Sequence, residues 1–304
     1  MATYEVIVIG GGPGGLTAGL YAIRAGLRTL LLEKSMYGGQ IVNSQHVENY
    51  PGFPDGVSGF ELASLMQQQA ANYGLEMVTQ EVTGVNVGKT HRVITSENEY
   101  ETDVVIIAAG SEYSRLGVPG EEQYLGKGVS YCATCDGFLF REKDVAVVGG
   151  GDTAITDALE LGQHVSNVYV IHRRDQLRAG KVLQQRAFEH PKIQFKWDSV
   201  VEKIEGDALV KELKLRNVKT DEVSSLPVSG IFVAVGLHPN TGPFNGVVDV
   251  DKNGQIIVDE TMRTSAQGIY AAGDIRAHSA RQVSTAVGDG AAAAMAAFKY
   301  IKEK

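Results

Sequence analysis

Cysteine is scarce in this sequence, and long apolar runs are absent. Only two cysteines occur in 304 residues, Cys132 and Cys135, and they form a single C-x-x-C pair. That number excludes the multi-disulfide framework of small secreted proteins. No apolar run approaches the ~20 residues of a transmembrane helix, and no signal-type segment opens the chain. We therefore expect a cytoplasmic protein that does not enter a membrane.

Positive charge is also in short supply. Lysine and arginine number 28 against 36 aspartates and glutamates, which gives a formal net charge of −8. An acidic balance argues against nucleic acid or an anionic membrane as a partner. Glycine, by contrast, is abundant at 36 residues, and such glycine often serves backbone that turns tightly or approaches a ligand. The length predicts two domains or one large one.

Short apolar strands alternate with amphipathic helices, which is typical of an α/β fold. The pattern occurs twice, and the two copies begin 139 residues apart, at Gly10 and Gly149. The predicted elements are strand 4–9, helix 14–25, strand 29–32, strand 104–108, strand 145–148, helix 152–161 and strand 168–171. Further strand-like runs lie in 255–274, and a small-residue helix is expected over 281–301. The repeat predicts two Rossmann-like, doubly wound, three-layer dinucleotide-binding domains.

Two stretches rich in glycine and proline, 110–120 and 236–246, flank the second copy. We predict that residues 1–112 and 246–304 form one discontinuous domain. Residues 113–245 would then be an inserted domain that carries the C-x-x-C pair. Two chain crossings of this kind suit a hinge.

The first glycine motif, G-x-G-x-x-G, consists of Gly10, Gly12 and Gly15, between a predicted strand and a predicted helix. Its first two glycines permit a tight turn and close approach to a pyrophosphate, and the third permits close packing of helix and strand. Glu33 ends the next strand, where a carboxylate accepts hydrogen bonds from ribose hydroxyls. The alternative, a glycine turn without a ligand, does not explain the strand, helix and acid together.

The second glycine motif contains Gly149, Gly151, Asp152 and Thr153, again after a strand. Its following strand ends in His172 and a basic cluster instead of an acid. Guanidinium groups pair with phosphate through forked hydrogen bonds, so this cluster favours NADPH over NADH. The arginines that we assign to the 2′-phosphate are Arg173, Arg174 and Arg178. For Lys181 and Arg186 a solvated helix face is the better interpretation.

The C-x-x-C pair brings Cys132 and Cys135 close enough to form a disulfide and can lower the pKa of one thiol. Half of a zinc site is the main alternative, but zinc needs two more ligands and the sequence has no other cysteine. We therefore predict a redox-active dithiol and no metal. Asp136, the next residue, is the candidate proton donor or acceptor.

A fourth candidate site lies near the C-terminus, where Asp274 follows a predicted strand. A carboxylate there can hold a ribityl hydroxyl, and the helix that follows Arg281, Gln282 and Val283 would direct its N-terminus at a flavin. An ordinary turn and a core helix explain this segment equally well from composition alone.

Over nearly its whole length the sequence resembles the low-molecular-weight thioredoxin reductases. The markers are GGGPGG at 10–15, GGQ at 38–40, ENYPGF at 48–53, CATCDG at 132–137, GGGDTA at 149–154, HRRDQLRA at 172–179, FVAVGLHPNT at 232–241 and GDIR at 273–276. The resemblance implies a homodimer with tightly bound FAD that reduces thioredoxin with electrons from NADPH. It also implies that Cys135 faces the flavin and that Cys132 attacks thioredoxin.

The resemblance also assigns binding residues. The FAD-lining set is Gly10, Gly12, Gly15, Glu33, Gln40, Asn49, Asp274, Arg281, Gln282 and Val283. The NADPH set is Gly149, Gly151, Asp152, Thr153, Arg173, Arg174 and Arg178. Phe138 and Leu139 match an apolar pocket for thioredoxin and Lys127 a basic docking position, although core packing and a surface lysine explain these three as well.

Three other functions compete with this expectation. The first is a flavin disulfide reductase whose donor is ferredoxin, against which the intact second glycine motif argues. The second is an NAD(P)H oxidase or a peroxiredoxin reductase. The third is a flavin-binding redox sensor without catalysis. Because the dithiol and the NADPH motif fall in one predicted domain, we also expect a rotation at the two crossings, so that each reaches the flavin in turn.

Overall fold

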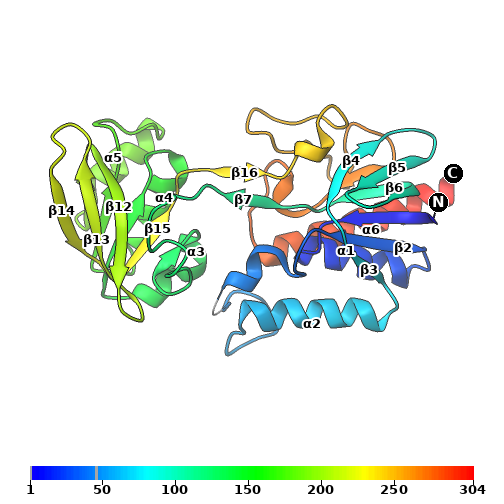
Figure 1. Ribbon diagram of the computed structural model, residues 1–304, viewed down its shortest axis with the longest axis horizontal. Helices are drawn as coiled ribbons and strands as arrows, with labels where there is room; N and C mark the ends of the chain where they lie inside the picture. Colours follow the sequence, from blue (N-terminus) through cyan, green and yellow to red (C-terminus); the bar gives the residue numbers. More distant parts are fainter. Residues whose placement is uncertain (1, 45–46) are drawn as a thin grey trace. The chain divides into compact units, whose positions relative to one another are not determined.

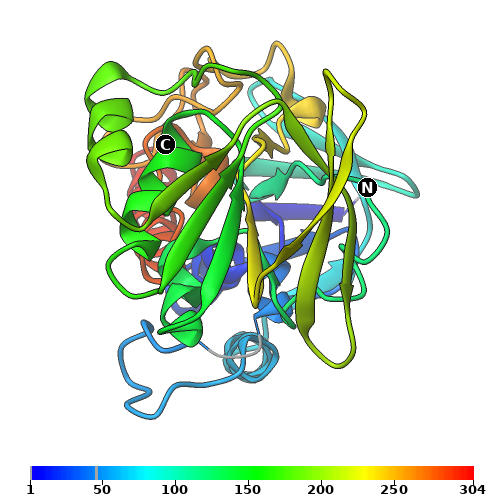
Figure 2. The same ribbon diagram turned by 90° about the vertical axis from the view of Figure 1, so that its left-hand side faces the viewer.

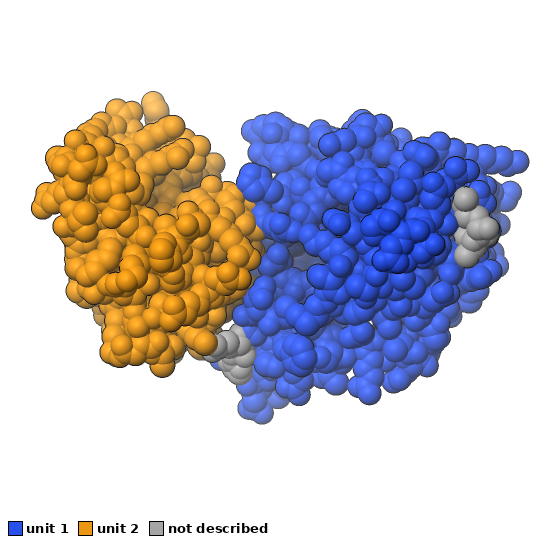
Figure 3. All heavy atoms as spheres, in the orientation of Figure 1, with its two compact units in different colours: residues 1–112, 238–304 blue, residues 113–237 orange. Residues whose placement is uncertain are grey.

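The computed structural model describes residues 2–44 and 47–304, which divide into two compact units (Figure 3). Unit 1 comprises residues 1–112 and 238–304, and unit 2 comprises residues 113–237. The second crossing therefore lies at residues 237–238 and not at 245–246, where the sequence analysis drew it. Phe244 explains the difference, because its buried ring packs in the core of unit 1.

Unit 1 is built on a sheet whose strands follow the order β3-β2-β1-β6-β5-β4, with β17 pairing the end of β6 (Figure 1). The parallel strands are β1 (Ala2–Ile9), β2 (Thr29–Glu33), β3 (Glu76–Thr79), β6 (Glu99–Ile107) and β17 (Ile269–Ala271). Strands β4 (Val82–Asn86) and β5 (His91–Thr95) add an antiparallel extension. Residues 255–268, where the sequence predicted strand, contribute only isolated bridges.

Both faces of this sheet are covered by a hydrophobic core. Successive residues of a strand point to opposite faces, so each strand contributes to both cores. Val6 and Val8 of β1 face one core and Ile7 and Ile9 the other. The first core is closed by three helices, α1 (Pro13–Arg24), α2 (Gly59–Asn72) and α6 (Val283–Glu303). Of these, α2 is drawn below the sheet in Figure 1. Helices α1 and α6 pack at short range through Gly290, where a Cβ would lie 2.1 Å from the carbonyl oxygen of Gly14.

Unit 2 repeats the plan on a smaller scale, with the parallel order β11-β10-β9-β15-β8. These strands are β8 (Val129–Ser130), β9 (Asp144–Val148), β10 (Asn167–Ile171), β11 (Ile193–Lys196) and β15 (Gly230–Val233). One face packs against α4 (Asp152–Leu161) and α5 (Lys181–Glu189). The other packs against an antiparallel sheet of β12 (Ser199–Gly206), β13 (Val210–Asn217) and β14 (Val223–Pro227), in yellow-green in Figure 2.

The two crossings run side by side as a short ribbon, in which β7 (Ser111–Tyr113) pairs with β16 (Leu237–Pro239) (Figure 1). The Asn240 side chain donates to the carbonyl oxygen of Ala109 over 2.8 Å, which ties the two segments where they enter unit 1. No helix in the described part of the chain is both long and apolar enough to cross a membrane.

Candidate functional site

The first glycine turn is shaped by contacts that only glycine permits. Gly10 has a φ of +107°, and a Cβ there would lie 2.3 Å from the carbonyl oxygen of Ala108. A Cβ on Gly15 would lie 1.8 Å from the carbonyl oxygen of Gly10. Gly12 differs, because the nearest atom to its Cβ position is 3.9 Å away. Gly10 and Gly15 therefore serve the fold, and Gly12 leaves the open side on which a ligand fits at the N-terminus of α1.

Glu33 ends β2 as the sequence predicted, and it is buried. Its carboxylate accepts hydrogen bonds from the backbone N–H of Gly11 over 2.6 Å and of Ser35 over 2.9 Å. These bonds fix the carboxylate beside the glycine turn. A carboxylate has about four acceptor positions, so capacity is left for ribose hydroxyls.

The start of α6 lies beside a loop from the N-terminal half of unit 1. Asn49 donates from its side-chain amide to Oε1 of Gln282 over 3.0 Å, although the two residues are 233 positions apart. Gln282 is the N-cap residue and Val283 the first residue of α6. Gln40 lies in a 3-10 turn over Gly39–Asn43, and its side chain is exposed. The structure therefore joins Asn49 and Gln282, whereas the hydrogen bond of the Gln40 side chain among the described residues is to Asn43.

Arg281 holds an unsatisfied polar atom. Its Nε is buried and has no hydrogen-bond partner among the described residues, and its backbone has a φ of +57°. Buried donors almost always have a partner, so this nitrogen is suited to an acceptor from a ligand. This nitrogen and the open side of Gly12 are both suited to a polar ligand.

Asp274 lies in a short 3-10 turn over Gly273–Ile275, directly before this region. Burial raises the pKa of the Asp274 carboxyl, and the hydroxyl of Ser279, 3.1 Å from Oδ1, opposes that rise. The turn is anchored to α6 by Asp289, which accepts from the Gly273 backbone over 3.1 Å and from the Arg276 Nε over 2.6 Å. Arg276 is therefore a structural partner of Asp289.

The second glycine turn, in unit 2, has the same division of roles. Gly149 has a φ of +151°, and a Cβ there would lie 2.5 Å from the carbonyl oxygen of Ala234. At Gly151 a Cβ would meet nothing within 4 Å. Asp152 begins α4, and its Oδ1 accepts from the backbone N–H of Gly180 over 2.7 Å. Thr153 follows it with an exposed side chain.

His172 explains how the basic loop is held over this turn. A Cβ on Gly150 would lie 2.3 Å from the imidazole Cε1, so the ring packs directly on the glycine. The carbonyl oxygen of Gly150 accepts from the backbone N–H of Arg178 over 2.6 Å and of Ala179 over 3.1 Å. His172 is buried, and burial lowers its pKa. The sequence did not predict what His172 contacts. In the structure the imidazole ring packs on Gly150 and positions the loop that carries the arginines.

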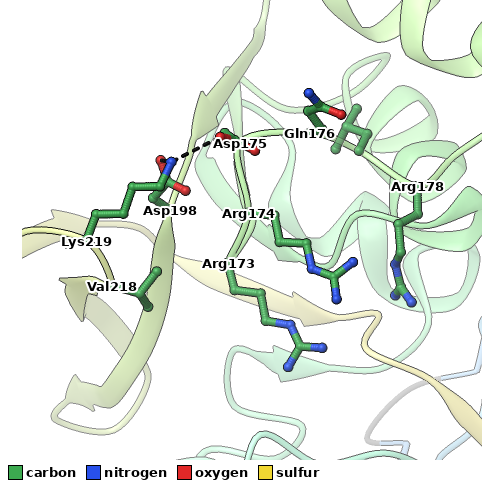
Figure 4. Close-up of a pocket in the computed structure, with 9 residues that line it drawn as sticks. Arg173, Arg174, Asp175, Gln176, Arg178, Asp198, Val218 and Lys219 are labelled. Atoms are coloured by element: carbon green, nitrogen blue, oxygen red, sulfur yellow. Dashed lines mark hydrogen bonds and ion pairs between the residues drawn. The ribbon is translucent and has the colours of Figure 1, made fainter.

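The basic loop lines a pocket of about 360 Å³ in unit 2 (Figure 4). Arg173, Arg174 and Arg178 contribute exposed guanidinium groups to it. Within the described residues, no ion pair and no side-chain hydrogen bond occupies any of these three groups. A cavity that holds three uncommitted guanidinium groups is suited to a phosphate.

Cys132 and Cys135 form a disulfide across the first turn of a short helix, α3 (Ala133–Asp136). Both residues are half-buried, and the backbone N–H of Cys135 points at Sγ of Cys132 over 3.2 Å. A disulfide in this position can accept an electron pair, which converts it to two thiols, and it can exchange with an attacking thiolate. The described residues contain no cluster of His, Cys, Asp or Glu suited to a metal ion.

Asp136 lies at the end of α3, and burial raises its pKa. The hydroxyl of Ser130 donates to Oδ2 of Asp136 over 2.6 Å and accepts from the backbone N–H of Cys132 over 3.0 Å. Ser130 is itself buried. Sequence reasoning missed Ser130, although its place two residues before the first cysteine was a signal that could have identified it.

The predicted docking residues lie close to the dithiol in the chain. Phe138 is half-buried, and Leu139 is 43% exposed. Lys127 is exposed and lies in the turn before β8. Leu139 and Lys127 are thus available to a partner, whereas the next aromatic residue, Phe140, belongs to the core.

The fold and the site define a class of protein. Two dinucleotide-type units, each with an open glycine turn, and a reducible disulfide in the second unit are typical of flavin-linked disulfide reductases. The sequence model of the pyridine nucleotide-disulphide oxidoreductases matches residues 4–290. The chain belongs to that class.

Its relatives narrow the class further. The chain is 45% identical to a thioredoxin reductase from Streptomyces coelicolor, over 98% of this chain and 94% of the relative. A crystal structure of thioredoxin reductase from Streptococcus pyogenes superposes with a TM-score of 0.96 at 46% identity, over 100% of this chain and 99% of that one. A crystal structure of Lactococcus lactis thioredoxin reductase in the FR conformation superposes with a TM-score of 0.67 at 44% identity, over 99% of this chain and 100% of that one. The chain is a member of the thioredoxin reductase family.

Proposed function

We propose that this protein is an NADPH-dependent thioredoxin-disulfide reductase that uses FAD. The observation that carries the proposal is the composition of unit 2, where one small domain holds a reducible disulfide and a pocket of three uncommitted arginines. An electron donor with a phosphate group and a disulfide acceptor are the two substrates that such a unit would serve. Membership of the thioredoxin reductase family supports thioredoxin as the acceptor.

Unit 1 would hold FAD. The open side of Gly12 and the N-terminus of α1 suit the pyrophosphate, and Glu33 suits the ribose. Asp274 and the start of α6 would hold the ribityl chain and the ring system, with the unsatisfied Nε of Arg281 among the donors. When bound, the flavin would supply the redox chemistry that side chains lack, because it can accept a hydride and pass the electrons on to a disulfide.

Unit 2 would hold NADPH. The turn at Gly149 and Gly151 and the N-terminus of α4 suit the pyrophosphate, beside Asp152 and Thr153. Arg173, Arg174 and Arg178 would bind the 2′-phosphate, which NADH lacks. His172 would position their loop through its packing on Gly150.

The two cysteines would carry the electron pair to the acceptor. In the reduced protein the Cys132 thiolate attacks one sulfur of the thioredoxin disulfide, and the other sulfur leaves as a thiolate. Cys135 then attacks Cys132 of the mixed disulfide, which releases dithiol thioredoxin and restores the Cys132–Cys135 bond. Asp136, whose pKa burial raises, would exchange protons with the cysteine thiolates in these steps.

We also propose that the ribbon of β7 and β16 acts as a hinge, because one flavin must serve both the nicotinamide and the dithiol. Two relatives support it, since nearly equal sequence identities of 46% and 44% accompany TM-scores of 0.96 and 0.67. A homodimer is proposed as well. Unit 1 exposes several large apolar side chains, namely Tyr21, Phe60, Leu65 and Met295, which an interface between two copies would cover. Sedimentation of the purified protein tests the dimer.

A coupled assay tests the function. The purified protein is mixed with NADPH or NADH and with oxidised thioredoxin, and free thiols on thioredoxin are counted. We expect thiols to form faster with NADPH, and Cys132→Ser or Cys135→Ser to abolish them. Flavin reduction without thiol formation in the unmodified protein would overturn thioredoxin as the acceptor, and a failure of NADPH to reduce the flavin would favour a ferredoxin-type donor.

A further inference from the structure

The arginine pocket contains carboxylates as well as arginines. Asp175 lies between Arg174 and Arg178 in the chain, and Asp198 lines the same cavity from the start of the antiparallel sheet. A carboxylate at a phosphate site is unfavourable in two ways. It repels the dianion, and it competes with the phosphate for the guanidinium groups.

Lys219 engages both carboxylates. Its Nζ lies 3.0 Å from Oδ2 of Asp175 and 3.0 Å from Oδ2 of Asp198. Figure 4 shows this ion pairing on one side of the pocket, with the guanidinium groups of Arg173, Arg174 and Arg178 turned away from it. In the described structure both acids are thus paired with the lysine and neither with an arginine.

The backbone holds Lys219 in this position. The lysine lies in the turn between β13 and β14, where Oδ1 of Asn217 accepts from the backbone N–H of Lys219 over 2.9 Å. Val218 donates to the carbonyl oxygen of Asp198 over 2.6 Å, and Asp198 donates to the carbonyl oxygen of Arg174 over 3.3 Å. A hydrogen-bonded chain therefore links the hairpin turn to the arginine loop.

The geometry points to Lys219 as a specificity-determining residue for the nucleotide: by pairing with Asp175 and Asp198 it keeps the three arginines free for a 2′-phosphate. The inference rests on the proposed use of NADPH and concerns the same pocket. The pocket holds four cationic and two acidic side chains, so removal of Lys219 would halve its net charge of +2. It would also release two carboxylates to the arginines.

Binding of NADP⁺ and NAD⁺ to the flavin-loaded protein, measured by calorimetry, tests this. We expect Lys219→Met to weaken NADP⁺ binding by about three- to tenfold at low salt, and less at high salt because the charges are exposed and screened. NAD⁺ binding should change less than about twofold. Lys219→Arg should keep the wild-type affinity. Adding Asp175→Asn and Asp198→Asn to Lys219→Met should restore most of the NADP⁺ affinity.

Lys214→Met is the matched control. Lys214 lies in β13 of the same sheet and also contacts two carboxylates, Glu205 at 3.4 Å and Glu212 at 3.0 Å, but it does not line the pocket. Its loss should leave both nucleotides unaffected. Equal weakening of NADP⁺ and NAD⁺ by Lys219→Met, or no weakening, would overturn the inference while leaving the donor proposal intact. A wild-type protein that binds both nucleotides equally would overturn both.

Discussion

The two glycine turns of this protein follow the same plan in opposite chemical surroundings. In each unit a strand leads through a glycine of positive φ into a helix, at Gly10 and Gly149, and in each the second motif glycine is open. In unit 1 the next strand ends in a buried carboxylate, Glu33, that binds the turn itself. In unit 2 it is followed by arginines whose guanidinium groups have no ion pair or side-chain hydrogen bond within the described residues.

We propose that this difference sets the nucleotide specificity of each unit. The glycine turn and the helix N-terminus suit any pyrophosphate, because backbone N–H groups and the helix dipole do not distinguish nucleotides. The residues that follow the second strand would distinguish them. A carboxylate suits ribose hydroxyls, and guanidinium groups suit a phosphate on the ribose. Four sets of substitutions test this difference between the two sites.

The largest effect is expected from Gly15→Ala compared with Gly151→Ala. A Cβ at Gly15 would overlap the carbonyl oxygen of Gly10 at 1.8 Å, whereas at Gly151 it meets open space. We expect Gly15→Ala to prevent folding of unit 1 or to cost at least about 4 kcal/mol. Gly151→Ala should stay within about 0.5 kcal/mol of wild type while raising the KM for NADPH. Thermal unfolding and flavin content are measured for both variants. A Gly15→Ala protein that is stable and binds flavin would contradict the structural role of Gly15.

The next effect is on donor preference. Arg173→Ala together with Arg174→Ala removes two charge-assisted contacts to the 2′-phosphate, each worth about 1.5–3 kcal/mol. The ratio of kcat/KM for NADPH to that for NADH should fall by about 100-fold or more, with little change in flavin content. Lys181→Ala with Arg186→Ala, on the exposed face of α5, is the control. A ratio that the arginine substitutions leave unchanged would place the 2′-phosphate elsewhere.

Glu33→Gln should affect unit 1 alone. The substitution replaces one of the two carboxylate oxygens that accept the N–H groups of Gly11 and Ser35 by an amide nitrogen. Losing one such bond costs about 1–3 kcal/mol, so flavin should dissociate on dilution about tenfold more readily. The NADPH to NADH ratio should stay at the wild-type value, and a change in that ratio would show that the two sites are not separate.

The smallest effect concerns a further parallel, since each unit holds an aspartate whose pKa burial raises and a serine hydroxyl lowers. In unit 2 the pair is Asp136 and Ser130, and in unit 1 it is Asp274 and Ser279. Ser130→Ala removes the bond that favours the ionised carboxyl, so the pKa of Asp136 should rise further. The rate of thioredoxin reduction should then decline at a higher pH, because Asp136 stays protonated longer.

Ser279→Ala is the control, and it should leave that pH profile in place. A profile that Ser130→Ala shifts to lower pH would contradict the role of the serine.

The pH dependence of protein stability gives a second test of the raised pKa of Asp136. A folded-state pKa above the ordinary value means that stability is present at low pH and is lost as pH rises through the folded pKa. Asp136→Asn should remove this dependence, as urea unfolding at several pH values would show.

Local pattern was enough to predict much of this molecule. The helix over 152–161 was placed to the residue, and the strands beside both glycine motifs were placed within a few residues. The exception is β6, which begins at Glu99, five residues before the predicted start. Those elements depend on apolar periodicity and glycine, which are visible in short windows. The helix predicted from 281 begins at Val283, because Gln282 is its N-cap.

Long-range contacts were beyond the reach of such patterns. The antiparallel sheet β12–β14 has no local signature that distinguishes it from exposed loops, and it supplies Lys219 to the arginine pocket. The contact of Asn49 with Gln282 joins residues 233 positions apart. Packing of His172 on Gly150 depends on how two loops meet. The residues expected to react or to bind nucleotide could be predicted from residue type and motif. The residues that position them could be identified only from the folded structure.

We propose that two similar units bind two different dinucleotides, FAD at the site that contains Glu33 and NADPH at the site that contains the three arginines. Anaerobic titration of the flavin-loaded Arg173→Ala/Arg174→Ala protein beside wild type, with NADPH and then with NADH, tests it most directly. We predict that NADPH bleaches the wild-type flavin at low concentration and that the variant needs about 100-fold more NADPH. The NADH concentration that bleaches the flavin should be the same for both proteins. Equal bleaching of both proteins by NADPH would contradict the claim.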